Sequence, residues 1–158
     1  MLTILEKVLF LQNVDVFSEV DSEKLAAVAA IGVEVDVAPG ELLYAEAGPS
    51  DAMYLVLSGI IRLHRGDTVI TRAKTGEAFG IWALFDDELR VVSATCEQAA
   101  RLLRISKDDF IELLADDVDI TRAVLKAVVR RLRSVLGRVG SGAGVDLQAG
   151  EPHGDTTK

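Results

Sequence analysis

Between residues 33 and 105 the sequence is divided into short apolar or alternating runs, and each run ends at a turn signal. The first run alternates Val33, Val35 and Val37 with acidic residues, which is the pattern of a half-buried strand. The turn signals are Pro39-Gly40, Gly48-Pro49, Ser58-Gly59, Gly66-Asp67 and Gly76-Glu77. Strands at such short and regular spacing favour an antiparallel sandwich or barrel over alternating β-α units. We therefore predict about eight short strands.

Helical periodicity flanks this β-region on both sides. Apolar residues recur at helical spacing in residues 2–12, and a second helix is expected from the N-cap Asp21 to Gly32. After the strands, Ser106 has the character of an N-cap, and a longer helix is expected to follow Asp116. This order of elements predicts an α+β fold.

Composition restricts both the class of protein and its partners. A chain of 158 residues suits one domain with a core, and the net charge of −8 argues against chain-wide affinity for nucleic acid or anionic membranes. No uncharged apolar run approaches the roughly 18 residues of a membrane span, and Glu6 and Lys7 interrupt the N-terminal apolar segment, unlike a secretory signal. Cys96 is the single cysteine, so no intrachain disulfide is expected. These features predict a cytoplasmic, soluble domain.

The long C-terminal helix carries an apolar stripe at nearly heptad spacing. Its members are Val118, Leu125, Val128, Leu132 and Val135. Such a stripe is either a seam for a partner helix or a face packed on the β-region, and the packed face is the favoured interpretation for one helix of this length. The cations of this helix are Arg122, Lys126, Arg130, Arg131, Arg133 and Arg138. They are expected to form a solvated basic face that could also meet an acidic surface of a neighbouring domain.

Residues 79–94 fit neither a helix nor a strand, and their sequence is FGIWALFDDELRVVSA. An apolar segment is followed by three acids, Asp86, Asp87 and Glu88, and then by Arg90, which leads directly into an apolar run. An arginine beside a buried strand is costly unless it is paired. Its partner is either an anionic ligand or one of the three acids. The acids themselves indicate a solvated loop, because consecutive acids lack the spacing of metal ligands.

Three segments together resemble the cyclic-nucleotide-binding domain family, which includes catabolite-activator-type regulators, cyclic-nucleotide-dependent kinases and gated channels. The segment APGELLYAEAGPSDAMYLVLSG resembles the family's Pro-Gly turn and the two strands that follow it. The segment GEAFGIWALFDDELR resembles its phosphate-binding cassette, and LLRISKDDFIELL resembles the strand and helix after the cassette. The resemblance covers residues 2–139. It implies an antiparallel, jelly-roll-like β-roll of about eight strands with flanking N-terminal helices, a short cassette helix and a long C-terminal helix.

The domain organisation follows from this likeness. One domain is expected over residues 1–139, with N-terminal helices at 2–31, a β-roll with its cassette at 32–105, and C-terminal helices at 106–138. The long helix is expected to end at Gly137 or Gly140. Residues 140–158 are Gly-rich and nearly free of large apolar side chains, which predicts a disordered tail or linker.

The resemblance also assigns roles within the cassette. Gly80 would permit a tight turn that aims the free N–H groups of a short helix at residues 81–85 toward an anion. Ala83 is small enough to let a ligand approach. Arg90 would neutralise a cyclic phosphate, which makes a ligand its favoured partner, and Arg131 would lie near the ribose. The implied ligand-binding residues are Gly80, Ile81, Trp82, Ala83, Arg90, Val91, Val92 and Arg131.

The cassette departs from the family pattern at several positions. Ile81 stands where the family has a glutamate that accepts hydrogen bonds from the ribose. A buried ribose hydroxyl left unpaired costs about 1–3 kcal/mol, or roughly 5- to 150-fold in affinity. Leu89 replaces a proline, Val91 replaces a small residue, and Trp82 is bulkier than the usual aliphatic. The anion-binding arginine is therefore kept, while sugar recognition is weakened and Arg131 loses a partner.

The sequence thus predicts a non-catalytic sensor domain that binds an anionic ligand, cAMP or cGMP first, and signals through the C-terminal helix. The alternative is a degenerate copy that binds no nucleotide and serves as a protein-interaction or scaffold module. No catalytic group, metal site or cofactor is predicted, since His64 is isolated on a strand and Cys96 has the character of a small buried residue. Only a Gly-rich tail follows the long helix, where the activator branch has a helix-turn-helix, so no nucleic-acid binding by this chain is expected. The expected partner of the C-terminal helix is another protein or domain, with a homodimer as one option.

Overall fold

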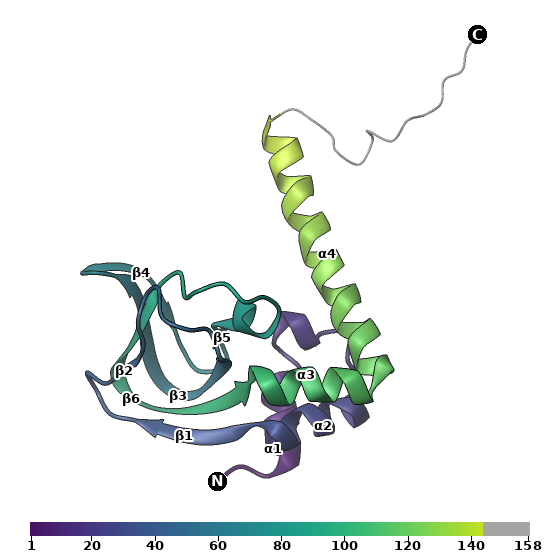
Figure 1. Cartoon of the computed structure of the whole chain (residues 1–158), viewed down its shortest axis with the longest axis horizontal. Coiled ribbons are helices and arrows are strands. Elements are labelled where there is room, and N and C mark those ends of the chain that lie inside the picture. The colour runs from purple at the N-terminus through teal and green to yellow at the C-terminus, as the bar shows by residue number, and fades with distance from the viewer. Residues whose placement is uncertain (144–158) are drawn as a thin grey trace.

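The structure, a computed structural model, describes residues 1–143 and has a curved antiparallel sheet beside a group of helices (Figure 1). The N-terminal helical elements are α1 (Ile4–Leu11), η1 (Asp15–Phe17) and α2 (Ser22–Ile31). The strands are β1 (Val33–Val37), β2 (Leu42–Tyr44), β3 (Ala52–Arg65), β4 (Thr68–Ala73), β5 (Ala78–Phe79) and β6 (Ser93–Ser106). The turn η2 (Ile81–Leu84) precedes β6, and α3 (Lys107–Asp116) and α4 (Val118–Ala143) follow it. The predicted α+β fold is confirmed.

The sheet contains fewer and longer strands than predicted. Its order is β1-β6-β3-β4, with β2 beside β6 and β5 beside β3, and all pairs are antiparallel. Residues 1–143 contain six strands rather than about eight, because β3 and β6 each run for 14 residues. The predicted turn at Ser58-Gly59 lies inside β3, where the register against β6 shifts on both sides of Ser58. Gly59 has φ 92°, and a Cβ there would lie 2.4 Å from the Ala99 carbonyl oxygen, so this glycine lets the long strand bend against its partner.

Two helices, α2 and α3, begin at the predicted capping residues. The Asp21 carboxylate accepts a hydrogen bond from the Lys24 backbone N–H, and α2 ends before Gly32. The Ser106 hydroxyl accepts a hydrogen bond from the backbone N–H of Asp109. Each contact satisfies a backbone donor that has no partner within the first turn of its helix.

The predicted end of the long helix is wrong. α4 does not stop at Gly137 or Gly140 but continues to Ala143. A glycine inside a helix costs only about 1 kcal/mol relative to alanine, so it weakens a helix without ending it. The predicted tail begins inside α4, and its remainder at residues 144–158 lies outside the described part of the chain.

Two apolar clusters stabilise the domain. The first joins the helices to β3 and β6, and its fully buried members include Leu11, Phe17, Leu25, Phe110 and Ile120. The second lies among the strands and includes Tyr54, Val56, Phe79, Cys96 and Leu102. Cys96 is buried there, as predicted, and burial raises the pKa of its thiol. The turn at residues 81–84 lies between these clusters, because Phe79 just before it belongs to the second and Leu84 to the first.

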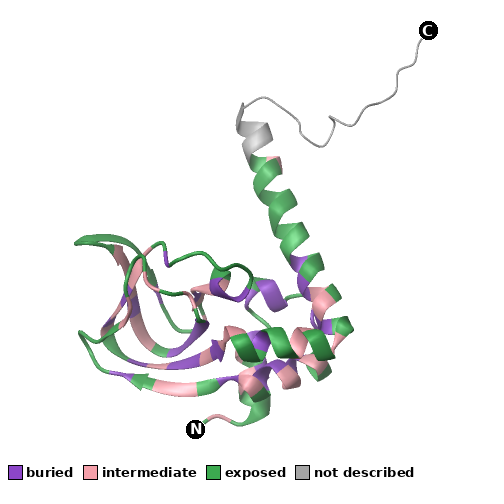
Figure 2. Ribbon diagram, viewed as in Figure 1, coloured by how far each residue is buried: buried purple, intermediate pink, exposed green. Residues whose placement is uncertain are grey.

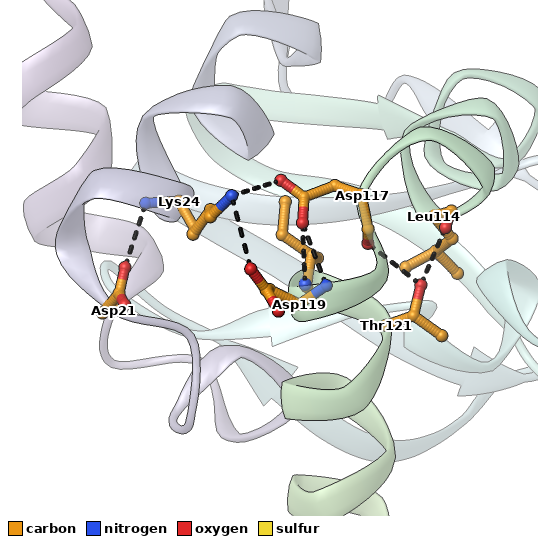
Figure 3. A network of polar contacts seen from close by, with 7 residues as sticks. Asp21, Lys24, Leu114, Asp117, Asp119 and Thr121 are labelled. Atoms are coloured by element: carbon orange, nitrogen blue, oxygen red, sulfur yellow. Dashed lines mark hydrogen bonds and ion pairs between the residues drawn. The ribbon is translucent and has the colours of Figure 1, made fainter.

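The start of α4 is held by polar contacts around Asp117 (Figure 3). One oxygen of the Asp117 carboxylate accepts hydrogen bonds from the backbone N–H groups of Asp119 and Ile120, at 3.0 and 3.2 Å, and so caps the helix. The other oxygen lies 2.9 Å from the ammonium of Lys24 on α2. The Thr121 hydroxyl donates to the carbonyl of Leu114 on α3. These contacts fix the first turn of α4 against α2 and α3.

The apolar stripe of α4 is exposed, so the prediction that it packs on the β-region is wrong. Its members Val118, Leu125, Val128, Leu132 and Val135 are 37–67% exposed. A different face of the helix is buried, through Ile120, Val124 and Ala127. Figure 2 shows exposed residues covering α4 beyond its first turns. No helix in residues 1–143, α4 included, has the length and apolar character needed to cross a membrane.

Candidate functional site

The cassette begins with a left-handed glycine and one short turn. Gly80 has φ 70° and ψ 21° and caps η2. The helix expected at residues 81–85 is a four-residue 3-10 turn, so it has little of the dipole of a longer helix. Ala83 and Leu84 are buried and attach this turn to the core. A helix dipole therefore contributes little at this position, and any charge that the cassette offers comes from its side chains.

The Arg90 backbone is fixed by a loop distant in the sequence. Its N–H donates to the Gly48 carbonyl oxygen at 2.9 Å, and its carbonyl oxygen accepts from the Ala47 N–H at 2.8 Å. The apolar run after Arg90 predicts a strand that starts at this arginine, but β6 begins only at Ser93. Arg90 therefore lies in the loop between η2 and β6, and this loop is tied to the one that follows β2.

The Arg90 side chain is buried, and no carboxylate in residues 1–143 lies within hydrogen-bond distance to neutralise its charge. It is the one buried charged residue among those described, at 6% exposure. Its Nη2 donates to the Ala52 carbonyl oxygen at 2.7 Å and lies 3.6 Å from a carboxylate oxygen of Asp51, a residue that is largely exposed. Its Nε is buried and has no hydrogen-bond partner in the described chain. A buried guanidinium with an unused donor is suited to bind an oxyanion.

The acidic trio does not neutralise Arg90. Instead, Lys107 at the start of α3 donates to the Asp86 carbonyl oxygen and pairs with the Asp87 carboxylate. The hydrogen bond from Lys107 lowers the pKa of Asp87. Asp86, Asp87 and Glu88 are exposed, as expected of a solvated loop. The alternative that Arg90 pairs with one of these three acids is thus wrong. The carboxylate that approaches Arg90 belongs to Asp51.

Gly80 and Arg90 are brought together, as the sequence predicted. A Cβ added to Gly80 would lie 2.7 Å from Arg90 Nη1 and 3.4 Å from both the Ala52 carbonyl oxygen and the Tyr44 hydroxyl. The absence of a side chain at Gly80 therefore makes room for the guanidinium. The positive φ and this close approach both require glycine at the position.

Tyr44 and Asp51 belong to the site, although sequence reasoning missed them. The Arg90 Cζ lies 3.8 Å from the centre of the Tyr44 ring, which is a cation–π contact. Tyr44 also belongs to an aromatic group with Tyr54 and Phe79, at ring distances of 6.2 and 6.3 Å. Burial raises the pKa of Tyr44 to about 12, so its hydroxyl stays protonated at neutral pH. The only sequence signal was an aromatic residue at the end of a short strand.

The other predicted site residues have different surroundings. Ile81 is half-buried and packs against the helix-side core. Trp82 and Val91 are 70% and 52% exposed, and Val92 is half-buried. Their contact with a ligand stays a prediction.

Arg131 lies in a separate group of charges on α4. Its guanidinium pairs with the carboxylate of Asp15 in η1. Its neighbour Arg130, and Lys126 one turn before Arg130, both pair with Glu19, just after η1. These contacts are partly exposed, and they connect the middle of α4 to the N-terminal helical segment. The structure thus gives Arg131 a carboxylate partner, Asp15, that does not belong to the cassette.

No metal centre accompanies the arginine site. Within residues 1–143 no group of three or more His, Cys, Asp or Glu side chains is arranged to hold a metal ion. His64 hydrogen-bonds through its ring nitrogens with the Gly66 carbonyl oxygen and the Thr95 hydroxyl. The chemical group that the described side chains provide at this site is the buried guanidinium of Arg90.

Comparison with known proteins gives a consistent likeness. A family model described as the cyclic nucleotide-binding domain matches residues 34–117. The chain is 27% identical over 128 residues to a CRP-like cAMP-activated global transcriptional regulator from Mycobacterium tuberculosis, over 78% of this chain and 57% of the regulator. It is 29% identical over 115 residues to the cAMP-dependent protein kinase regulatory subunit of Aspergillus niger, over 72% of this chain and 28% of that subunit. The chain thus spans little more than half of the length of the first relative.

A solved structure extends the likeness to three dimensions. The N-terminal domain of a transcriptional regulator from Streptomyces coelicolor A3(2) matches with a TM-score of 0.73 and 29% identity, over 78% of this chain and 90% of that one. The curved sheet and its helices are therefore shared with a regulator domain.

Proposed function

This chain belongs to the cyclic nucleotide-binding domain family, and from that premise we propose that it is a regulatory sensor domain whose anionic ligand binds at Arg90. The first candidates are cAMP and cGMP. The observation that carries the proposal is the burial of the Arg90 guanidinium with its Nε lacking a partner in the described chain. A cyclic phosphate supplies the acceptor and the negative charge that this guanidinium lacks.

The energetics support a ligand at this position. Burying a charge is expensive unless it is paired and hydrogen-bonded. Within residues 1–143, the Arg90 side chain has one hydrogen bond, to Ala52, and a longer approach to Asp51, which is largely solvated. Solvent screens an exposed carboxylate, so Asp51 offsets the charge only partly. A phosphate that approaches the guanidinium edge completes the neutralisation.

We expect cyclic nucleotides to bind weakly. Ile81 offers no acceptor for the ribose hydroxyl, and its side chain packs against the helix-side core. Arg131 is engaged with Asp15. The loss of sugar contacts lowers affinity by roughly 5- to 150-fold relative to a site with an acceptor.

The proposed output is the position of α4. η2 packs against α3, and α3 packs against α4, so a ligand that shifts the cassette has a continuous route to the helix. The ion pairs of Glu19 and Asp15 with α4 hold it in the present position, and a ligand acts by favouring another one. The exposed stripe of α4 is the surface offered to a protein partner, an adjacent domain or a second copy of the chain.

A degenerate scaffold module is the second candidate function. It is favoured by the Tyr44 ring over Arg90, by the nearby Asp51 and by Ile81 in the cassette. In this case Tyr44 and Asp51 partly compensate the buried charge of Arg90. No ligand is then needed, and α4 is the surface that binds a protein partner.

Calorimetric titration with cAMP and with cGMP separates the two candidates. The sensor requires submillimolar binding by the wild type and a loss of at least about tenfold in Arg90→Ala, since a charged hydrogen bond is removed. Arg104→Ala is the matched control, because Arg104 also approaches Asp51, at 3.4 Å, but is more exposed. No heat and no thermal shift at millimolar nucleotide would sink the sensor proposal and leave the scaffold.

A further inference from the structure

Tyr44 has an unusual position relative to the anion site. It ends β2, a strand paired with β6, and its ring covers one face of the Arg90 guanidinium. A guanidinium binds an anion through its edge, where the N–H donors lie. The Tyr44 ring occupies one face of the guanidinium and so lies beside that edge.

The Tyr44 hydroxyl also converges with the arginine at Gly80. The position of the missing Cβ at Gly80 lies 2.7 Å from Arg90 Nη1 and 3.4 Å from the Tyr44 hydroxyl. Within residues 1–143 the Tyr44 hydroxyl makes no hydrogen bond to another protein group, whereas Arg90 Nη2 is bonded to Ala52. Two donors from distant segments thus meet beside the first residue of the cassette.

We propose that Tyr44 is a second ligand-contacting residue, whose hydroxyl donates a hydrogen bond to the oxyanion that Arg90 neutralises. The inference rests on the proposed function of the arginine and adds a specificity-determining residue to it. The ligand must then present at least two acceptor oxygens, one to the guanidinium and one to the phenol. A phosphate, whether free or in a cyclic nucleotide, has this chemistry.

The state of the phenol agrees with this role. Burial raises the pKa of Tyr44 to about 12, so the hydroxyl keeps its proton between pH 6 and about 9 and remains a donor throughout. Its ring is also held by the neighbouring Tyr54 and Phe79 rings. The donor is therefore positioned before a ligand arrives.

Tyr44→Phe tests the hydroxyl alone, because it keeps the ring over Arg90. We expect calorimetric affinity for cAMP, and for inorganic phosphate as a second probe, to fall about tenfold, the loss of one hydrogen bond to a charged acceptor. Tyr54→Phe, in the same aromatic group, is the control and should change affinity less than about twofold. Unfolding curves without ligand show whether each variant keeps its fold.

A second measurement uses the wild type and so does not depend on a variant. The sequence has two tyrosines, Tyr44 and Tyr54, so ¹³Cζ-labelled tyrosine gives two NMR signals. We expect only the Tyr44 signal to shift when cAMP or phosphate is added. An unshifted Tyr44 signal with saturable binding overturns the inference and leaves the function of Arg90 intact. Shifts with phosphate but no binding of cAMP or cGMP support Tyr44 and contradict the nucleotide proposal. Binding of neither probe overturns both.

Discussion

The Arg90 guanidinium carbon lies 3.8 Å from the centre of the Tyr44 ring, so an aromatic face, rather than a buried carboxylate, covers this cation. The remaining contacts are a carbonyl oxygen at Ala52 and a solvated carboxylate at Asp51. This arrangement keeps the arginine ordered without fully neutralising it.

Replacing Arg90 with methionine is expected to keep or raise stability in the absence of ligand. A buried charge with partial pairing costs desolvation energy, and an apolar side chain of similar volume is often neutral or stabilising by about 1–4 kcal/mol. Thermal unfolding of Arg90→Met should therefore show a Tm no lower than that of the wild type. A fall of more than about 5 °C would mean that Arg90 is chiefly a structural residue.

Gly80→Ala is expected to reduce both stability and anion affinity. The left-handed backbone at φ 70° costs an alanine about 1 kcal/mol, and its Cβ would lie 2.7 Å from Arg90 Nη1. Gly66→Ala is the matched control, because Gly66 has φ 56° and no neighbour within 4 Å of an added Cβ. Urea unfolding should show a similar loss in the free energy of unfolding from the strained backbone of each variant. Calorimetry should show weaker nucleotide binding only in Gly80→Ala, because only there does the added Cβ displace Arg90. Equal binding by both would argue against the Gly80–Arg90 contact.

Much of this site was predictable because its residues are close in the sequence. Gly80 and Arg90 lie in one irregular segment, and an arginine before an apolar run already indicated a paired or ligand-binding role. Tyr44 and Asp51 were missed because each comes to Arg90 from another loop, through the pairing of β2 with β6 and the course of the chain into β3. Periodicity and turn signals describe local segments and do not reveal such long-range contacts.

In the fold, too, features set by local sequence were predictable and features set by long-range packing were not. Capping residues such as Asp21 and Ser106 predicted helix starts, because a cap acts on its own first turn. The number of strands was overestimated, since Gly59 produces a bend within β3 rather than a chain reversal. The stripe on α4 was assigned to the core because its spacing is helical, but only tertiary packing decides which face of a helix is buried.

Asp51→Asn is expected to raise anion affinity by about two- to fivefold. An exposed carboxylate near a charge is worth at most about 1 kcal/mol, and its removal frees Arg90 for a ligand. Calorimetry at low and at high salt should show the gain shrinking as salt screens the carboxylate. Asp67→Asn, in the exposed turn between β3 and β4, is the control. Unchanged or weaker binding by Asp51→Asn would show that Asp51 helps to hold the ligand or the loop.

The attachment of α4 is expected to weaken as the pH falls from neutral into the acid range. The hydrogen bond from Lys24 lowers the pKa of Asp117 below its usual 3.8. A lowered pKa in the folded state gives stability that is present above the ordinary value and is lost as the pH falls through the folded value. Asp117→Asn keeps the capping oxygen but not the charge, so its thermal stability should lie below that of the wild type at pH 7 and converge with it below about pH 4. A difference that is independent of pH would contradict this role of the Lys24–Asp117 pair.

The most direct test of the account is the NMR signal of the Arg90 Nε–H group, followed while cAMP or cGMP is added. This donor has no hydrogen-bond partner in the described chain, and the signal is assigned from its absence in Arg90→Lys. We predict a saturable downfield shift of this one signal as the phosphate accepts its hydrogen bond, with the Arg104 signal changing little. A signal that stays in place at millimolar concentrations of both nucleotides would contradict the proposal that Arg90 binds the ligand.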